Sequence, residues 1–452
     1  MEKIGHKYHF GVYEKLIIYL LYWSILQDFV LPLIYKLSGS LLLTNILFYQ
    51  KDIIFFILLI WCLSKKQNKD IFVISVAFAL VIGTGVIHGF INGASISAIV
   101  SDARGLIILP GFLLIGYRIK NEDFKEFLVN RYIPFLVFCA LFGLFDYVLD
   151  LATGTKEFWT NGIGLTRYLI DIKHIDESSN SIIMGLPGNF YGYGSNGEFY
   201  AAKRVVSFWA NPLGAGYVLI IPSVYYFFNL IYFKKRDKKT IILTLICFVA
   251  VFLTKTRAIL LGFGVAIFIF AITKLEKRAY IIVTGIFGVI ILMMRKGINA
   301  FISFFVDGST MGHLAHLLNP RYLFNFFGNG VGMSGNQVES VFLTIISHIG
   351  WIGLILYVIL YCTVMIKTYK NRYICDLSLM VAYVTIIYFV GGVFSAMLLR
   401  YTTVVPLFIM LGYSQNLKKS YTITTSIRVV RSINKGFDDE SRTVLLETIS
   451  RF

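Results

Sequence analysis

The run VFLTIISHIGWIGLILYVILYCTVMI, residues 341–366, decides the fold class of this chain. It is longer than the roughly 20 residues that cross a lipid bilayer as an α-helix, and it contains no Lys, Arg, Asp or Glu. Its apolar residues are not confined to one helical stripe, so the helix needs apolar surroundings on all sides. Uncharged runs also occupy 241–254 and 377–398. Together they predict a multi-pass membrane protein.

Composition supports this class. The chain is 57% hydrophobic and 15% charged, whereas soluble domains are about 45–50% apolar and about 25% charged. A net charge of +17 in a soluble protein would suggest nucleic acid as partner. Here most basic residues lie in short loops between apolar runs, which is a topology signal. We therefore expect membrane lipids and no nucleic acid around this chain. The first apolar run is too long for a cleaved signal peptide.

We predict an all-α bundle of about twelve transmembrane helices in a single domain, residues 1–414, followed by a basic cytoplasmic tail, 415–452. Three of the predicted spans are short; 52–63 gains an outer turn from 43–50. The span 240–254 runs into 258–273 through a tight turn at 255–257. The predicted spans are 16–35, 52–63, 71–91, 105–117, 132–149, 208–232, 240–254, 258–273, 279–294, 341–366, 377–398 and 402–414.

Orientation follows from the basic residues of the loops. With the N-terminus in the cytoplasm, the cytoplasmic segments hold 28 of the 42 Lys and Arg residues. The short loops KKRDKK (234–239) and KLEKR (274–278) place basic residues on that side. Both termini are then cytoplasmic. Two long loops, 152–207 and 295–340, fall on the opposite face, and loops of this length are commonly functional.

Five arginines lie at or near the outer ends of the predicted helices. One such arginine alone is explained by anchoring at the membrane interface. Five together favour a binding role, because anchoring basic residues concentrate on the cytoplasmic side. The planar guanidinium also matches phosphate oxygens. We therefore predict pyrophosphate and sugar binding by Arg104, Arg204, Arg257, Arg321 and Arg400.

The second long loop contains the candidates for a general base. Glu339 and His313 carry side chains able to deprotonate a hydroxyl, although Glu339 also suits a helix start. Asp28 and His348 lie inside apolar spans, where an ionisable group is a functional candidate. We see neither a metal-ligand spacing nor a phosphate loop, and expect no metal and no nucleotide cofactor.

Several segments resemble the O-antigen and capsule polymerase/ligase superfamily of bacterial inner membranes. The resemblance rests on motif order and sidedness as much as on any one motif, and covers roughly 200–360. Arg321 is followed after ten residues by Gly332, a spacing typical of the polymerases; Arg204 lacks it. The motifs are SFWANPLGAG (207–216), LTKTRAILL (253–261), FGNGVG (327–332), ESVFL (339–343) and HIGWIGL (348–354).

The resemblance implies a glycosyltransferase that polymerises undecaprenyl-pyrophosphate-linked oligosaccharide repeat units at the periplasmic face, for lipopolysaccharide O-antigen, capsule or exopolysaccharide. A chain-length regulator protein is a candidate partner. The ligases carry a His-rich stretch before the span that begins here at Val341, whereas this chain has NQVES at 336–340. That difference favours a polymerase over a ligase to lipid A core. A polysaccharide flippase or other secondary transporter remains the alternative from another class.

Overall fold

The computed structural model describes residues 8–64, 69–153, 158–173, 182–183, 186–187, 190–191, 203–274, 325–333 and 340–433, with side chains of the last helix through Leu417. The helices of the N-terminal half are α1 (Val12–Ser38), α2 (Leu41–Leu63), α3 (Lys69–Ile91) and α4 (Ile96–Arg118). One continuous helical span follows, made of α5 (Asp123–Phe127), the π-helical η1 (Leu128–Tyr132) and α6 (Ile133–Thr153).

The segment after α6 contains a π-helical turn η2 (Phe158–Gly162), α7 (Leu165–Asp171), and a two-stranded antiparallel hairpin of β1 (Ile182–Ile183) and β2 (Leu186–Pro187). The C-terminal half is again helical. Its elements are η4 (Ser207–Trp209), α8 (Pro212–Ile231), α9 (Lys238–Leu253), α10 (Arg257–Lys274), α15 (Val341–Lys370), α16 (Asp376–Phe394), η5 (Ala396–Leu399) and α17 (Tyr401–Ile433).

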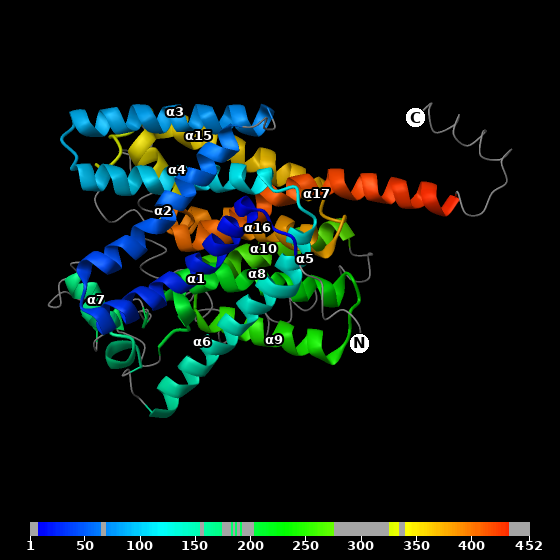
Figure 1. Ribbon diagram of the computed structural model, residues 1–452, viewed down its shortest axis with the longest axis horizontal. Coiled ribbons are helices and arrows are strands. Elements are labelled where there is room, and N and C mark those ends of the chain that lie inside the picture. Colours follow the sequence, from blue (N-terminus) through cyan, green and yellow to red (C-terminus); the bar gives the residue numbers. More distant parts are fainter. Residues whose placement is uncertain are drawn as a thin grey trace, which may run out of the picture.

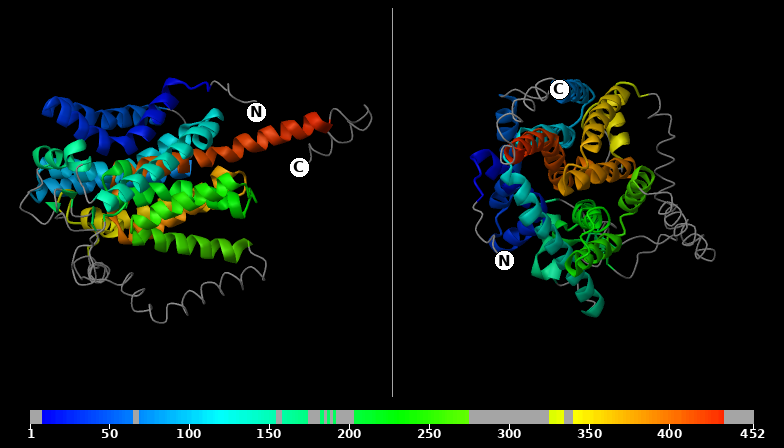
Figure 2. Two further views of the ribbon diagram at one scale, coloured as in Figure 1. Left: turned by 90° about the horizontal axis from the view of Figure 1, so that it is seen from below. Right: turned by 90° about the vertical axis from the view of Figure 1, so that its right-hand side faces the viewer.

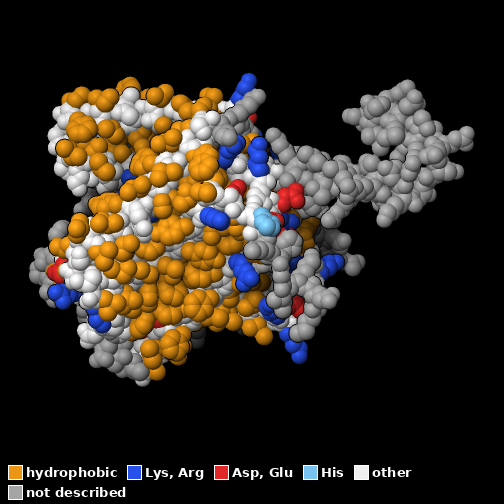
Figure 3. Space-filling view, viewed as in Figure 1, with side chains coloured by type: hydrophobic (Ala, Val, Ile, Leu, Met, Phe, Trp, Pro, Cys, Tyr) orange, Lys and Arg blue, Asp and Glu red, His pale blue; other side chains and the backbone are white. Residues whose placement is uncertain are grey.

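The long helices run roughly side by side as one bundle (Figure 1). Within the described residues, eight are long and apolar enough to cross a membrane. α8 and α16 are the most buried of these, whereas α2 and α3 expose most of their surface. Hydrophobic side chains cover the middle of the face seen in Figure 3, and Lys and Arg gather toward its ends. The predicted class, an all-α membrane bundle, is confirmed.

Eleven of the predicted spans fall on described helices, and 279–294 lies outside the described residues. The total of about twelve and the two long loops stay predictions. Three boundaries differ clearly from expectation. α2 begins at Leu41, eleven residues before the predicted 52, with Ser40 as its N-cap. α4 begins at Ile96, before the predicted 105, because the Ser95 side chain accepts from the Ala98 N–H as its N-cap. α17 continues to Ile433, so the predicted tail starts as an extension of the last helix.

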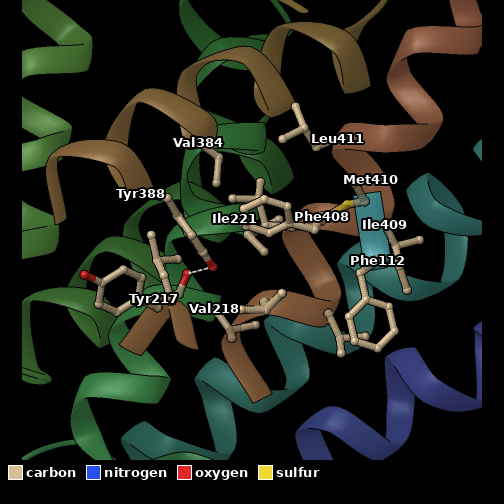
Figure 4. Packing of buried hydrophobic residues seen from close by; sticks show 14 of the residues in the cluster. Phe112, Tyr217, Val218, Ile221, Val384, Tyr388, Phe408, Ile409, Met410 and Leu411 are labelled. Atoms are coloured by element: carbon tan, nitrogen blue, oxygen red, sulfur yellow. Dashed lines mark hydrogen bonds between the residues drawn. The ribbon is translucent and has the colours of Figure 1, made fainter. Parts of the chain in front are cut away.

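Close backbone contacts hold the centre of the bundle together. A Cβ on Gly116 of α4 would lie 2.3 Å from the Ile409 carbonyl oxygen of α17, and one on Gly412 would lie 2.2 Å from the Leu113 carbonyl oxygen. Such small-residue contacts are typical of membrane helix pairs. Next to them, the Tyr388 hydroxyl donates to the Tyr217 carbonyl (Figure 4). These contacts hold α17 against α4 and α16 against α8.

The two ends of the bundle carry different segments. At one end, the Asn121 side chain donates to the His9 carbonyl, and the Tyr413 hydroxyl donates to the Asn121 carbonyl. The first described residues and the later part of α17 therefore lie at the same end, as Figure 2 also shows. α7, η4 and η5 lie toward the opposite end, which we call the loop end. Both candidate clusters described below lie in the half nearer to it.

Candidate functional site

The first cluster is built where the chain enters α8. The Val205 N–H donates to the Leu253 carbonyl at 3.1 Å, and the Arg204 Nε donates to the Thr254 carbonyl at 2.7 Å. Carbonyls at the end of a helix lack partners within the helix. Arg204 and Val205 therefore satisfy two of these groups at the end of α9, and this positions the largely buried Arg204 against the α9–α10 turn.

Backbone conformation is unusual at this place. Four non-glycine residues among those described have a left-handed φ. Three of them lie where 203–211 meets the α9–α10 turn, which we call the corner: Ser207 at 50°, Ala210 at 45° and Lys255 at 52°. A side chain makes this conformation costly, and such strain concentrates at functional sites. Asn211 then starts α8 by accepting from the Leu213 and Gly214 N–H groups. The surrounding contacts thus maintain a strained corner.

Buried polar contacts fasten the corner to the bundle. The Thr256 hydroxyl donates to the Pro212 carbonyl at 3.2 Å, which ties the α9–α10 turn to the start of α8. Lys203 forms a buried ion pair with Asp146 of α6 at 2.8 Å, and the Trp159 indole donates to the same carboxylate at 3.0 Å. An ion pair this buried is stable only with such additional hydrogen bonds. It fixes the residue immediately before Arg204.

Three cations consequently share this corner. We define the first cation cluster as Arg204, Lys255 and Arg257; the last is the first residue of α10. Burial, and next the positive charge of Arg204, lower the pKa of Lys255. Both causes disfavour a charged Lys255, and a bound anion would counteract both. This arrangement is suited to binding a phosphate group.

A second cation cluster forms around Phe48 of α2. The Lys51 Nζ lies 3.3 Å and the Lys173 Nζ 4.0 Å from the centre of the Phe48 ring, and the Arg104 guanidinium carbon lies 5.8 Å from it. Lys51 also lies 5.6 Å from the centre of the Tyr401 ring, directly after Arg400. We define the second cation cluster as Lys51, Arg104, Lys173 and Arg400.

Two carboxylates accompany the second cation cluster. Asp52 pairs with Arg104 at 3.2 Å. Asp28 of α1 interacts electrostatically with Lys51, Lys173 and Arg400. Asp28 thus has the partners that its position in an apolar span requires. Among the described residues the cluster contains four cations and two carboxylates.

A buried pair links α15 with α4. The His348 Nε2 lies 3.5 Å from Asp102, and its Nδ1 lies 3.4 Å from the Gly330 carbonyl oxygen. Gly350 has φ 71° and kinks α15, so the Ser347 and His348 carbonyls can accept from the Asn329 and Gly330 N–H groups. Both nitrogens of His348 face oxygen atoms. The pair therefore connects α15 and α4 with the glycine-rich segment 325–333.

The predicted binding arginines divide between the two clusters. Arg204 and Arg257 belong to the first, and Arg104 and Arg400 to the second. Arg321 and the predicted bases Glu339 and His313 lie outside the described residues. Within the described part of the chain, no three His, Cys, Asp or Glu side chains are placed to hold a metal ion.

Three lysines of these clusters were not predicted from the sequence. Lys51 seemed to precede a span that starts at 52, but α2 starts at Leu41 and encloses it. An ionisable residue inside a longer apolar run would have been the signal. Lys255 lies within a motif already recognised, yet its role depends on a turn that its sequence does not specify. Lys173 reaches Phe48 across the fold, and no local pattern indicates that contact.

Comparison with known proteins adds nothing to this geometry, since no family profile, no curated protein and no solved structure matches the chain.

Proposed function

We propose that this chain is a glycosyltransferase that polymerises polyprenyl-pyrophosphate-linked oligosaccharide repeat units at the outer face of the bacterial inner membrane. The observation that supports this most is the first cation cluster: Arg204, Lys255 and Arg257 converge in a strained corner at the loop end of the bundle. Two of its members, Arg204 and Arg257, are among the arginines predicted from their positions near the outer helix ends to bind pyrophosphate. The third, Lys255, adds charge at the same place.

The proposed reaction needs no metal and no nucleotide sugar. An acceptor sugar hydroxyl attacks the anomeric carbon of the donor repeat, the bond from that carbon to the pyrophosphate oxygen breaks, and the polyprenyl pyrophosphate leaves. The hydroxyl proton passes to a base, for which Glu339 and His313 are our candidates. Cations held by the fold stabilise negative charge on the leaving group without further reorganisation. Guanidinium groups do so by paired hydrogen bonds.

This function requires the loop end to face outward, with both termini in the cytoplasm. Exposed residues at each end allow a test: Leu37 at the end of α1 is 76% exposed, and Lys238 is exposed at the start of α9. In whole cells, we expect a membrane-impermeant maleimide to label Leu37→Cys in a background without native cysteines. Lys238→Cys should react only after permeabilisation. The reverse labelling pattern would show that the loop end faces the cytoplasm, which excludes a reaction at the outer face.

A flippase for lipid-linked oligosaccharides is the second candidate. Lys51 and Asp28 each lie ten residues from the loop-end terminus of their helix, about 15 Å along the axis. Charged residues at such depth are also found where transporters bind substrates near the midplane. The depth of Lys51 and Asp28 is the observation that favours a flippase, whereas the first cation cluster lies at the loop end.

Deletion of the gene tests the two functions against each other. Without a polymerase, we expect the cell surface to carry single repeat units attached to lipid A core, because transfer across the membrane and ligation still occur. Loss of a flippase would leave no repeat units outside. Loss of a ligase would leave long polymer on the lipid carrier. Gel electrophoresis of the surface polysaccharide separates the three outcomes, and only single repeats agree with our proposal.

A further inference from the structure

The second cation cluster has an excess of positive charge in a sheltered place. Two ammonium groups, those of Lys51 and Lys173, approach one aromatic ring within 3.3 and 4.0 Å of its centre. A ring face attracts cations, which helps to hold each of them. Like charges this close repel strongly where water is scarce. The carboxylates of Asp28 and Asp52 offset two of the four positive charges among the described residues, and two remain.

Exposure within this cluster is graded. Lys51 is buried, with 2% of its surface exposed. Arg104 and Asp52 are partly exposed, at 32% and 14% of their side chains. Lys173 and Arg400 are exposed, although protein surrounds both side chains. The surrounding protein lowers the pKa of Lys173 by burial. An anion can therefore reach the cluster from outside and contact several cations at once.

Irregular segments of the chain bring the outermost cations inward. Arg400 lies between η5 and α17, at the level of Asp28 and Lys51 within the bundle. Lys173 follows α7 and comes down onto Phe48 of α2. Non-helical backbone at membrane depth is tolerated where it is buried in protein or lines a water-filled space. Both segments place a cation where the helices alone would not.

Apolar surface adjoins these charges. Leu41, seven residues before Phe48 and on the same face of α2, exposes 51% of its surface. Ile46, Tyr49 and Ile53 expose 58%, 54% and 60% on the side of α2 turned away from Lys51. Large exposed apolar side chains on a membrane helix face lipid. A ligand bound here can place an anionic group among the cations and a hydrocarbon chain along α2. This combination favours a membrane lipid over a free anion.

We infer that Lys51, Arg104, Lys173 and Arg400 bind the diphosphate group of an isoprenoid lipid, which gives the chain a second diphosphate site besides Arg204, Lys255 and Arg257. The two charges of a diphosphate esterified at both ends, as in a lipid-linked repeat unit, match the formal excess of the cluster. The inference deepens the proposed function, because a polymerase acts on two lipid-linked substrates together. Phe29, next to Asp28, contacts Phe208 of η4 at 5.1 Å between ring centres, so segments adjoining the two clusters touch.

Binding measurements on the purified full-length protein in detergent test this assignment without any polymerase assay. The probe is tritiated farnesyl diphosphate, and we expect two sites per chain. In Lys173→Gln/Arg400→Gln, which replaces the two exposed cations, one site should remain, since each lost charge-assisted contact weakens binding about tenfold or more. Arg204→Gln/Arg257→Gln should also retain one site. Lys51→Met should weaken the second site as well, provided that the protein elutes as a single species.

Arg167→Gln is the matched control. Arg167 lies on α7 near Lys173, is 75% exposed and pairs only weakly with Asp171, so its removal should leave two sites. Two unchanged sites in Lys173→Gln/Arg400→Gln would overturn the inference, even if polymerisation is confirmed. If the wild-type protein binds two farnesyl diphosphates and the double variant binds one, but the protein does not polymerise, the second site is supported and the proposed function fails. Inorganic pyrophosphate that competes as well as farnesyl diphosphate would overturn the lipid assignment.

Discussion

Replacing Arg204 or Arg257 by alanine is expected to lower polymer synthesis by about 100-fold or more while the protein remains in the membrane. This is the magnitude lost when one preorganised donor to a developing negative charge is removed. Arg204 is held in position by its hydrogen bond to the Thr254 carbonyl and by the buried Lys203–Asp146 pair on its N-terminal side. Polymer length is measured on gels, and protein amount by immunoblot of membranes.

Lysine at these positions should restore activity only in part. A lysine keeps the charge but cannot make paired hydrogen bonds to phosphate, and at position 204 it lacks the Nε–H that reaches the Thr254 carbonyl. Arg167→Ala again serves as the control for loss of an exposed cation at the loop end. Wild-type polymer in both Arg204→Ala and Arg257→Ala would show that the first cation cluster does not bind the leaving group.

The helical framework could be predicted from sequence because each span is a local pattern. A run such as 341–366 leaves few alternatives to a membrane helix, and the structure places α15 there. The predicted arginines were also found by a local rule, namely their location at helix ends. Arg204, Arg257 and Arg400 lie beside helix ends, whereas Arg104 lies eight residues inside α4, because that helix begins at Ile96.

The arrangement within each cluster could not be predicted, because it depends on tertiary contacts. Ser207, Ala210 and Lys255 adopt left-handed conformations without being glycines, so their sequence gives no sign of the corner. Contacts made elsewhere, such as Thr256 with Pro212, stabilise it. The approach of Lys173 to Phe48 joins residues far apart in the chain. The partner of His348, Asp102, was missed for the same reason.

Glu339→Gln is expected to stop chain extension, with a loss of about 100-fold to 10,000-fold, the range for removal of a general base. Glu339 immediately precedes Ser340, the buried N-cap residue of α15. The His348 Nδ1 faces the Gly330 carbonyl oxygen and its Nε2 faces Asp102. Our candidates for the base remain Glu339 and His313 of the second long loop. Glutamine keeps the shape of the side chain and removes its basicity. The purified variant should therefore still bind lipid-linked repeat units but fail to join them.

The position of Glu339 beside the start of α15 acts against its role as a general base. The helix dipole stabilises a nearby carboxylate in its charged form, which makes it a weaker base. Burial by the loop that precedes α15, or by the substrate itself, would have to offset this effect. His313→Ala is the matched variant from the same loop and should remain active. If Glu339→Gln joins repeat units normally and His313→Ala does not, the base is His313. If both variants are active, the acceptor hydroxyl is deprotonated by neither residue, and a direct general base from this loop is the wrong mechanism.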